Sequence, residues 1–256
     1  MKFSIVTCTL NSEAWLAASI ASVQAQRHRD VEQIFVDGGS TDGTLDLIAQ
    51  VPGNVRLVRE PVSGISAAMN AGVAAATGDI VAHLHSDDVY LGEHVFERVA
   101  GAFERNPRAD WVVGRCKSII DGELHDNHFE TKRFSRLELL RGNIVPHPST
   151  FVRREAFLAS GGFSTRLRYA MDYDLWLRLA QVSDPVQLPD YLAAFRFHAA
   201  STSTANPWPC LSEDFRVRVR HAGFDPLGYL EHAARLAVRS WRLRRSLRAG
   251  FRPAGA

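Results

Sequence analysis

Short apolar runs and longer helical patterns alternate along the first third of the chain. Runs of four or five apolar residues are typical of buried strands, whereas apolar residues every three or four positions, such as Leu16, Ile20 and Val23, indicate amphipathic helices. The predicted strands cover residues 3–6, 33–36, 55–58 and 80–84. This strand–helix order predicts a parallel sheet with right-handed crossover connections.

Polar caps and a glycine mark the helix boundaries in this region. Asn11 or Ser12 can cap the helix that follows the first strand. A second helix is predicted over residues 41–49. A third, rich in small residues, covers 65–76 and is expected to end at Gly78.

Polar residues collect where the predicted strands end. Asn11 follows the first strand, residues 37–42 follow the second, and residues 85–88 follow the fourth. In open sheets of parallel strands, ligands bind beyond the carboxyl ends of the strands. We therefore expect the functional site at this edge of the sheet.

The alternation weakens after Arg115. Residues 116–149 mix short strands and turns with many His, Arg and Asn residues, as an acceptor-binding insertion would. A helix is then predicted over residues 173–182, followed by a strand pair that runs to His198.

The chain divides into two predicted regions. Residues 1–205 form the main α/β domain, in which the pattern changes between residues 1–115 and 116–205. The Pro-Trp-Pro sequence at 207–209 marks a boundary, and residues 206–256 form a helical, arginine-rich C-terminal segment.

Composition narrows the class of protein. The 256 residues include 30 Lys and Arg against 28 Asp and Glu, a net charge of +2, so a nucleic-acid partner is not expected. Cys8, Cys116 and Cys210 have no metal-ligand spacing and suggest a reducing compartment. The first residues enter a strand pattern without a signal-peptide core, and no apolar run could span a bilayer. We therefore expect a cytoplasmic protein.

Known nucleotide-binding motifs are absent from the sequence. There is no P-loop pattern, and the first strand is not followed by G-x-G-x-x-G, which disfavours a dinucleotide-binding domain. The segment 37–43, Asp-Gly-Gly-Ser-Thr-Asp-Gly, has two interpretations. It is either a tight capped turn, or a site where Asp37 accepts hydrogen bonds from a base or ribose.

Three further groups of residues could carry chemistry or serve as caps. Adjacent carboxylates at Asp87 and Asp88 suit Mg²⁺ or Mn²⁺ but also suit a helix N-terminus. Asp172 and Asp174 start a helix whose apolar stripe is predicted at 175, 179 and 182, and either cap that helix or include a general base. His198 ends a predicted strand, where a lone histidine is more often structural.

In combination and order, these segments resemble the inverting family 2 glycosyltransferases, which have the GT-A fold. The resemblance covers residues 3 to about 203. It is carried by the motifs at residues 4–11, 36–44, 68–72, 76–79, 86–88, 146–155, 161–163, 172–179 and 195–198. The resemblance implies an α/β GT-A fold, Rossmann-like, with a mostly parallel central sheet and helices on both faces, plus the helical basic C-terminal appendage. It also implies that residues 1–115 form the nucleotide-sugar-binding half of the domain and residues 116–205 the acceptor-binding half.

The resemblance also implies roles for individual residues. Asp172 matches the catalytic base, whereas Asp174 matches a structural position inside the helix. The metal, Mg²⁺ or Mn²⁺, is expected at Asp88 and His198. The donor, most often a UDP-sugar, is expected at Thr7, Thr9, Asn11, Asp37, Asn70 and Asp87.

The implied reaction is transfer of a sugar from a nucleotide-diphospho-sugar to a hydroxyl of a glycan or lipid-linked sugar acceptor. Such enzymes act in polysaccharide or glycolipid assembly. Leu10, Cys8, Gly38 and His85 depart from the commoner family pattern, which leaves the donor sugar open. A non-catalytic sugar-nucleotide-binding or scaffolding protein is the alternative, and the retained acids argue against it.

The C-terminal helix has two interpretations. Leu236, Leu243, Leu247 and Phe251 can line one face, with Trp241 nearby and arginines over the rest. The helix either packs this stripe on the domain or attaches the protein to an anionic membrane surface at the cytoplasmic face.

Overall fold

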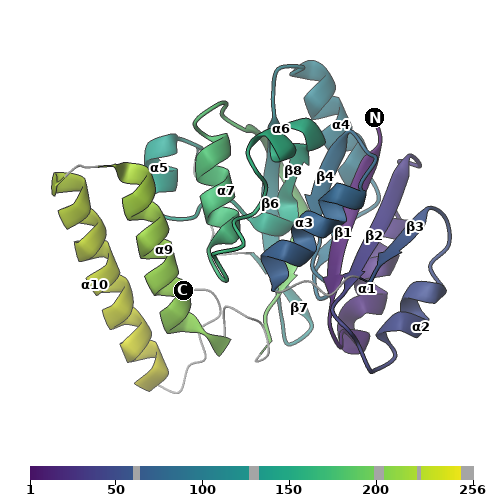
Figure 1. Ribbon diagram of the computed structural model, residues 1–256, viewed down its shortest axis with the longest axis horizontal. Coiled ribbons are helices and arrows are strands. Elements are labelled where there is room, and N and C mark those ends of the chain that lie inside the picture. The colour runs from purple at the N-terminus through teal and green to yellow at the C-terminus, as the bar shows by residue number, and fades with distance from the viewer. Residues whose placement is uncertain (60–63, 127–132, 199–204, 224–225, 249–256) are drawn as a thin grey trace.

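One sheet runs through the molecule, and helices cover both of its faces (Figure 1). The structure is a computed structural model. It describes residues 1–59, 64–126, 133–198, 205–223 and 226–248. Within these residues, nine strands form the sheet in the order β3-β2-β1-β4-β8-β6-β9-β5, with β7 paired to β6.

The first half of the sheet is parallel, as the sequence predicts. β1 (Phe3–Thr9) pairs with β2 (Val31–Asp37) and β4 (Ile80–His83), and β2 pairs with β3 (Val55–Val58), all in parallel. The connecting helices are α1 (Glu13–Gln24), α2 (Thr44–Ala49) and α3 (Ile65–Ala75). The carboxyl ends of β1, β2 and β4 therefore share one edge, where the polar motifs lie.

The second half joins this sheet through an antiparallel strand. β8 (Thr150–Arg153) pairs antiparallel with both β4 and β6 (Trp111–Ile120). β9 (Val186–Arg196) runs parallel to β6 and antiparallel to β5 (Val89–Tyr90). The short β7 (Glu123–Asp126) extends the edge beside β6.

The predicted strand pair before His198 is wrong, because β9 is one strand of 11 residues. Its register against β6 shifts between Gln187 and Tyr191. The extra residues of β9 surround Pro189, which has no N–H for the sheet ladder. A local irregularity within one strand therefore mimics a break in the sequence pattern.

Several predicted helix ends also move. α2 begins at Thr44, three residues later than predicted, because the Asp42 carboxylate accepts hydrogen bonds from the Thr44 N–H and hydroxyl. α7 (Met171–Leu179) ends before Val182, which is 80% exposed and outside the apolar stripe. Ser12 occupies the N-cap position of α1, but its side chain makes no capping hydrogen bond.

Gly78 does not cap α3, although the sequence suggests it. The helix ends at Ala75, and Ala76 is already extended. A Cβ at Gly78 would lie 2.9 Å from the Lys2 carbonyl oxygen and 2.5 Å from Ser4 Oγ. The glycine is needed because the chain here passes directly against the start of β1.

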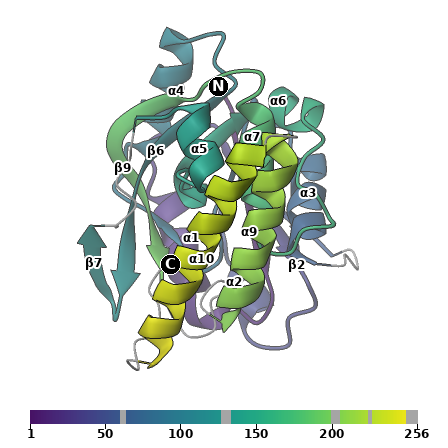
Figure 2. The same ribbon diagram turned by 90° about the vertical axis from the view of Figure 1, so that its left-hand side faces the viewer.

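The remaining helices complete both faces. They are α4 (Val95–Arg105), α5 (Arg136–Arg141), α6 (Arg154–Ala159), α9 (Pro207–Ala222) and α10 (Pro226–Arg248), with a 3₁₀ turn, η1, at His147–Ser149. α9 packs against α5 and α7, and α10 packs against α9 as the outermost helix (Figures 1 and 2). None of the helices within the described residues has the length and apolar composition that a membrane crossing needs.

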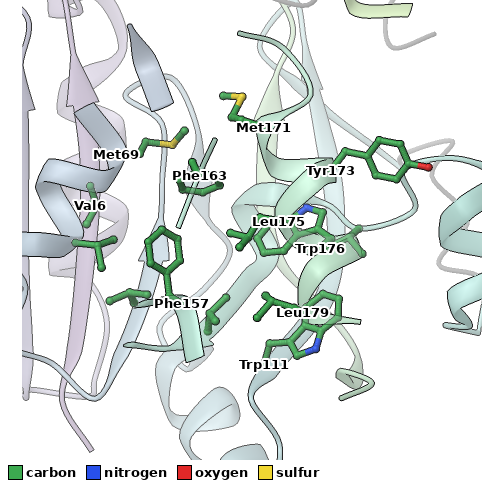
Figure 3. Packing of buried hydrophobic residues seen from close by; sticks show 14 of the residues in the cluster. Val6, Met69, Trp111, Phe157, Phe163, Met171, Tyr173, Leu175, Trp176 and Leu179 are labelled. Atoms are coloured by element: carbon green, nitrogen blue, oxygen red, sulfur yellow. The ribbon is translucent and has the colours of Figure 1, made fainter. Parts of the chain in front are cut away.

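Two large apolar clusters lie on opposite faces of the sheet. Neighbouring β1 residues separate between them, since Ile5 belongs to one cluster and Val6 to the other. Figure 3 shows the second cluster, in which Val6 and Met69 approach from one side and Leu175 and Trp176 of α7 from the other. Burial on both faces explains why the strands read as continuous apolar runs.

The predicted division of the main domain falls inside a strand. Residues 115 and 116 are consecutive in β6, so both halves contribute to one continuous sheet. The C-terminal boundary lies close to an element boundary, because α9 begins at Pro207. Positions from 249 onward, including Phe251 and Arg252, lie outside the described residues.

Candidate active site

The loops that follow β1 and β2 are joined by hydrogen bonds. Asn11 adopts a positive φ of 50°, and its side-chain oxygen accepts from the Thr41 N–H at 2.9 Å. The Asn11 N–H donates to Ser40 Oγ at 2.9 Å. Thr7 and Thr9 are almost fully buried beneath this junction. The predicted nucleotide-side residues Thr7, Thr9 and Asn11 therefore lie together at the carboxyl edge.

Asp37 organises the same junction. One of its oxygens accepts from the N–H groups of Gly39 and Ser40, and the other from the Thr9 and Ser40 hydroxyls, at 2.5 to 2.9 Å. Burial alone would raise the pKa of Asp37, but these donors outweigh it and lower the pKa. The four donors match the lone-pair sites of a carboxylate, so a base or ribose would have to displace one of them.

Asn70 connects α3 to a distant loop. Its Nδ2 donates to the Phe163 carbonyl at 2.8 Å, and its Oδ1 accepts from the Phe163 N–H at 2.9 Å. The neighbouring Gly162 has a φ of +66°, and a Cβ there would lie 2.7 Å from Asn70 Oδ1. This geometry gives Asn70 a loop-holding role; its predicted contact with a donor stays a prediction.

Asp87 and His198 form a pair. Asp87 belongs to the loop of residues 85–88 between β4 and β5, called the acidic loop below. His198 Nε2 lies 2.8 Å from Asp87 Oδ2, and both side chains are about a quarter exposed. The Asp87 carbonyl accepts from Arg196 Nε at 3.0 Å. The Arg196 guanidinium also stacks over the Trp15 ring, 4.5 Å from its centroid. A carboxylate and an imidazole thus meet at a position open to solvent.

Asp88 lies beneath the surface. One oxygen accepts from the Arg196 N–H at 3.0 Å, and the other, Oδ2, has no hydrogen-bond partner among the described residues. Burial raises the pKa of Asp88 well above its ordinary value, and the neighbouring Asp87 adds to this effect. The structure therefore pairs His198 with Asp87, whereas the sequence predicted His198 beside Asp88.

Three histidines, His83, His85 and His147, lie next to one another in or beside this loop, and the sequence analysis did not assign them a role. The His147 ring lies 5.2 Å from that of His85 and 5.7 Å from that of His83. Burial lowers the pKa of His147 well below its ordinary value, and the neighbouring histidines reinforce this. All three are therefore neutral near pH 7. His147 stands in the 146–155 motif, which was the available signal.

His147 connects the acidic loop with the helix that carries the predicted base. Its ring contacts His85, two residues before Asp87, and also Trp176, one turn along α7 from Asp172. The Nε2 atom of His147 and the Nε1 atom of Trp176 are buried without a partner among the described residues. Through these ring contacts, His147 links the loop that carries Asp87 to the helix that carries Asp172.

Asp172 lies in the first turn of α7 and is only partly exposed. Oδ1 accepts from the Tyr173 N–H at 2.6 Å, and Oδ2 from Asn143 Nδ2 at 3.3 Å. Burial raises the pKa of Asp172 to about 7; the Tyr173 N–H opposes this shift, and the charge of Asp214 adds to it. A carboxylate with such a pKa can accept and release a proton near neutral pH.

Asp174 differs from Asp172 in every contact. It is buried and ion-paired with Arg178 and with His221 of α9, each at 2.9 Å. Burial would raise its pKa, but His221 and Arg178 outweigh burial and lower it. Asp174 therefore holds α7 against α9 and remains ionised.

Comparison with known families shows to which family this chain belongs. The family model described as glycosyl transferase family 2 matches residues 4–159. The chain belongs to glycosyl transferase family 2. The match includes the loops after β1, β2 and β4, and α7 with its acidic pair follows it in the chain.

Relatives of this glycosyltransferase differ in how much of their length it spans. An uncharacterized glycosyltransferase of Mycobacterium tuberculosis is 30% identical over 75% of this chain and 74% of its own length. One from Nostoc sp. is 39% identical over 48% of this chain but only 38% of the relative. Chondroitin synthase of Pasteurella multocida is 30% identical over 79% of this chain and 21% of the synthase.

Solved structures share the fold of the glycosyltransferase. The fragment 1-349 of Staphylococcus aureus TarS in complex with UDP-GlcNAc has a TM-score of 0.72 at 18% identity, covering 93% of this chain and 71% of that fragment. The mannosyltransferase PcManGT from Pyrobaculum calidifontis, in complex with GDP-Man and Mn²⁺, has a TM-score of 0.64 at 17% identity, covering 93% of this chain and 75% of that one. The predicted GT-A fold is confirmed.

Proposed function

We propose that this enzyme transfers a sugar from a nucleotide-diphospho-sugar to an acceptor hydroxyl, with inversion and with Asp172 as general base. The observation that carries the proposal is the Asp172 carboxylate, partly exposed at the start of α7, with a pKa raised by burial to about 7. Asp174, the rival base, is occupied by Arg178 and His221. A base works best when its pKa lies near the operating pH.

The reaction follows from this assignment. Asp172 removes the proton of the acceptor hydroxyl while that oxygen attacks the anomeric carbon of the donor sugar. The nucleoside diphosphate leaves from the opposite face with the electron pair of the broken C–O bond. One displacement from the opposite face inverts the anomeric configuration, and no covalent sugar–enzyme intermediate is formed.

We assign a divalent cation, Mg²⁺ or Mn²⁺, to Asp87 and His198 in place of the predicted pair of Asp88 and His198. The Asp87–His198 pair is close and partly exposed, whereas Asp88 is fully buried. Among the described residues, no group of three or more His, Cys, Asp or Glu side chains is arranged so that it could hold a metal ion. Donor phosphates would complete the ligand set, as is common for Mg²⁺. When bound, the ion supplies Lewis-acid stabilisation of the leaving diphosphate.

We propose a UDP-sugar as the donor and a glycan or lipid-linked sugar as the acceptor, in polysaccharide or glycolipid assembly. UDP-GlcNAc in the TarS complex supports a UDP-sugar, whereas GDP-Man in the mannosyltransferase complex supports only a nucleotide-diphospho-sugar in general. The name of chondroitin synthase supports polysaccharide assembly. Thr7, Thr9, Asn11 and Asp37 would line the nucleotide side, since they lie at the shared carboxyl edge.

A transfer assay on the purified protein tests the proposal. Release of nucleoside diphosphate is measured with UDP-, GDP-, CDP- and dTDP-sugars, with Mn²⁺, Mg²⁺ or EDTA. We expect turnover with UDP-sugars that EDTA abolishes. Thermal stabilisation by a donor without turnover, across a panel of glycan and lipid-linked acceptors, would instead support a non-catalytic sugar-nucleotide-binding scaffold.

The metal assignment has its own test. Asp87→Asn and His198→Ala are expected to weaken the activation by Mn²⁺, seen as a higher Mn²⁺ concentration at half-maximal turnover. Asp88→Asn is the matched comparison, because it alters the adjacent carboxylate. A larger shift in Asp88→Asn than in Asp87→Asn would restore the pairing predicted from the sequence.

We also propose that α10 attaches the enzyme to an anionic membrane at the cytoplasmic face. Leu243 packs inward and is only 2% exposed, whereas Leu230, Val238 and Trp241 are exposed, and the chain after Glu231 carries arginines but no acid. Each arginine near such a surface contributes about 1 kcal/mol. The side chain of Leu247 lies outside the described residues.

Sedimentation with phosphatidylserine vesicles tests the membrane proposal. We expect binding at low salt that is lost at high salt, because the attraction is screened. Trp241→Ala should weaken binding, whereas Trp208→Ala on α9 serves as the matched control. Absence of binding at low salt would contradict the proposal.

A further inference from the structure

An acidic side chain of the C-terminal segment reaches the turn before α7. Glu213 of α9 is 6% exposed. Its Oε2 atom accepts hydrogen bonds from three consecutive backbone N–H groups, those of Arg168, Tyr169 and Ala170, at 3.0, 2.5 and 2.8 Å. Ala170 is the N-cap residue of α7, so these groups directly precede the helix that carries Asp172.

The turn is held from a second side by α3. Ser66 Oγ donates to the Leu167 carbonyl at 2.9 Å. The backbone at residues 167–170 is thus hydrogen-bonded both to α3 of the main domain and to α9 of the C-terminal segment. N–H groups at a helix start have no partner within the helix, so an external acceptor is needed when they are buried.

Glu213 is itself fixed in place. α9 is anchored to α7 by the ion pair between His221 and Asp174, at 2.9 Å. Farther along α9, Arg218 is fully buried, and its guanidinium donates to the Arg141 carbonyl of α5 at 3.4 Å. Only the second oxygen of Glu213 faces outward, where Arg216 lies 3.9 Å away. The acceptor therefore belongs to a rigid helix.

Asp172 depends on this anchor because its own side-chain contacts are few. One oxygen bonds the N–H of Tyr173, the next residue in the same turn, and the other receives a long bond of 3.3 Å from Asn143. In Figure 3 the Tyr173 side chain points away from Leu175 and Trp176. Its hydroxyl donates to the Leu139 carbonyl. The position of the carboxylate thus follows the backbone at the start of α7.

We propose that Glu213 is a positioning residue for Asp172: it fixes the backbone that begins α7 and thereby places the carboxylate against the acceptor hydroxyl. The inference rests on the proposed function, in which Asp172 is the base. It makes α9 a part of the active-site scaffold rather than an appendage to the glycosyltransferase domain. Small displacements of a reacting group can cost about 10²-fold in rate, which sets the scale of the effect.

The central test compares Glu213→Ala, Glu213→Gln and Arg216→Ala. Glu213→Ala is expected to lower kcat about 10- to 100-fold while leaving the KM for the UDP-sugar within about twofold, because donor-side loops are untouched. Glu213→Gln keeps an oxygen at the same reach and should recover most of kcat. Arg216→Ala removes only the outer ion pair and should retain wild-type kcat.

Hydrogen exchange supplies a readout that does not depend on catalysis. In Glu213→Ala, amides of residues 168–173 should lose protection, while those of β1 and β2 keep it. Glu213→Asp, whose carboxylate is one methylene shorter, serves for both measurements if the alanine variant does not fold, and it should then show a smaller loss of kcat and of protection, in the same places.

The outcomes separate this inference from the proposed function. Wild-type kcat in Glu213→Ala, or a loss carried by KM rather than kcat, would overturn the positioning role. If the alanine variant does not fold, Glu213→Asp with wild-type kcat and wild-type protection at 168–173 would do so as well. Full turnover in Asp172→Asn would instead overturn the proposed base, whatever the exchange data show at residues 168–173.

Discussion

Glu32, at the amino edge of the sheet, and the acids Asp88 and Asp172 of the candidate site differ in how many hydrogen bonds they accept. At the amino edge, Glu32 of β2 accepts hydrogen bonds from Ser4 Oγ, from the N–H and hydroxyl of Thr77 and from the Gly78 N–H, and it pairs with Lys2 at 3.1 Å. Burial would raise the pKa of Glu32, but these donors outweigh it and lower the pKa to about 2.

Asp88 and Asp172, on the site side, show the reverse. Each accepts few hydrogen bonds, and burial raises the pKa of both. Asp37 lies at the same edge yet accepts four hydrogen bonds, and its pKa is lowered. The number of donors, rather than the edge itself, therefore decides the protonation behaviour. Proton transfer needs a carboxylate that the fold leaves short of donors.

Asp172→Asn breaks the comparison on the site side and should have the largest effect. Without a base, kcat is expected to fall about 10²- to 10⁴-fold. The thermal unfolding midpoint should not fall, because the amide relieves a buried charge. Steady-state kinetics and a melting curve check both statements; Asp184→Asn, near the end of α7, is the control. Wild-type turnover in Asp172→Asn would remove the base assignment.

The pH dependence of kcat sharpens the same comparison. Asp172 must be ionised to accept a proton, so kcat should fall as the pH drops through about 7. The decrease should reach about tenfold per pH unit below that point. Measurements at saturating donor give the profile, and the residual activity of Asp172→Asn should lack this limb. A wild-type profile that stays flat down to pH 5 would contradict the raised pKa.

Glu32→Gln breaks the comparison at the amino edge and should change stability without changing kcat. The pKa of Glu32 is lower in the folded than in the unfolded protein. The ionised side chain therefore stabilises the fold at any pH above its unfolded-state pKa, and this contribution is lost as the pH falls toward 2. The variant should lose about 1–3 kcal/mol at pH 7. Urea titration measures it, with the exposed Glu104→Gln of α4 as control; equal stability of both variants would refute the expectation.

Asp88→Asn should shift stability in the other direction and by the smallest amount. The pKa of Asp88 is higher in the folded than in the unfolded protein, so the unfolded chain releases the proton of Asp88 more readily. Wild-type stability therefore falls as the pH rises above the pKa of Asp88 in the unfolded chain. At pH 8 without metal, the variant should be more stable than the wild-type protein, because the amide carries no charge at the buried position. Lower stability of Asp88→Asn at pH 8 would show that the carboxylate is needed for the Arg196 contact.

The sequence was sufficient for the first half of the fold, and it predicted that the polar loops after β1, β2 and β4 lie at one edge of the sheet. Strands buried on both faces leave apolar runs that local patterning detects, as at β1 and β4. In β9 the same patterning failed, because Pro189 and a register shift interrupt the run without ending the strand.

Side-chain direction explains most of what the sequence left undecided in the site. Asp87 and Asp88 are neighbours in the turn between β4 and β5, and only the structure shows that Asp87 meets His198 whereas Asp88 accepts from the Arg196 N–H. Glu213 lies 43 residues from Ala170 in the chain, and its pattern is that of any helix acid. Contacts between distant segments depend on the packing of α9, which leaves no local signal.

The partner of β5 sets the order in which this enzyme can form during synthesis. β5 pairs with β9, and the Asp88 carboxylate waits for the Arg196 N–H, 108 residues later in the chain. The parallel strands β1 to β4 can assemble while the ribosome is still producing β6 and β8. The acidic loop cannot be fixed until β9 has emerged, so the nascent chain gains the geometry of this loop only after Arg196 has been synthesised.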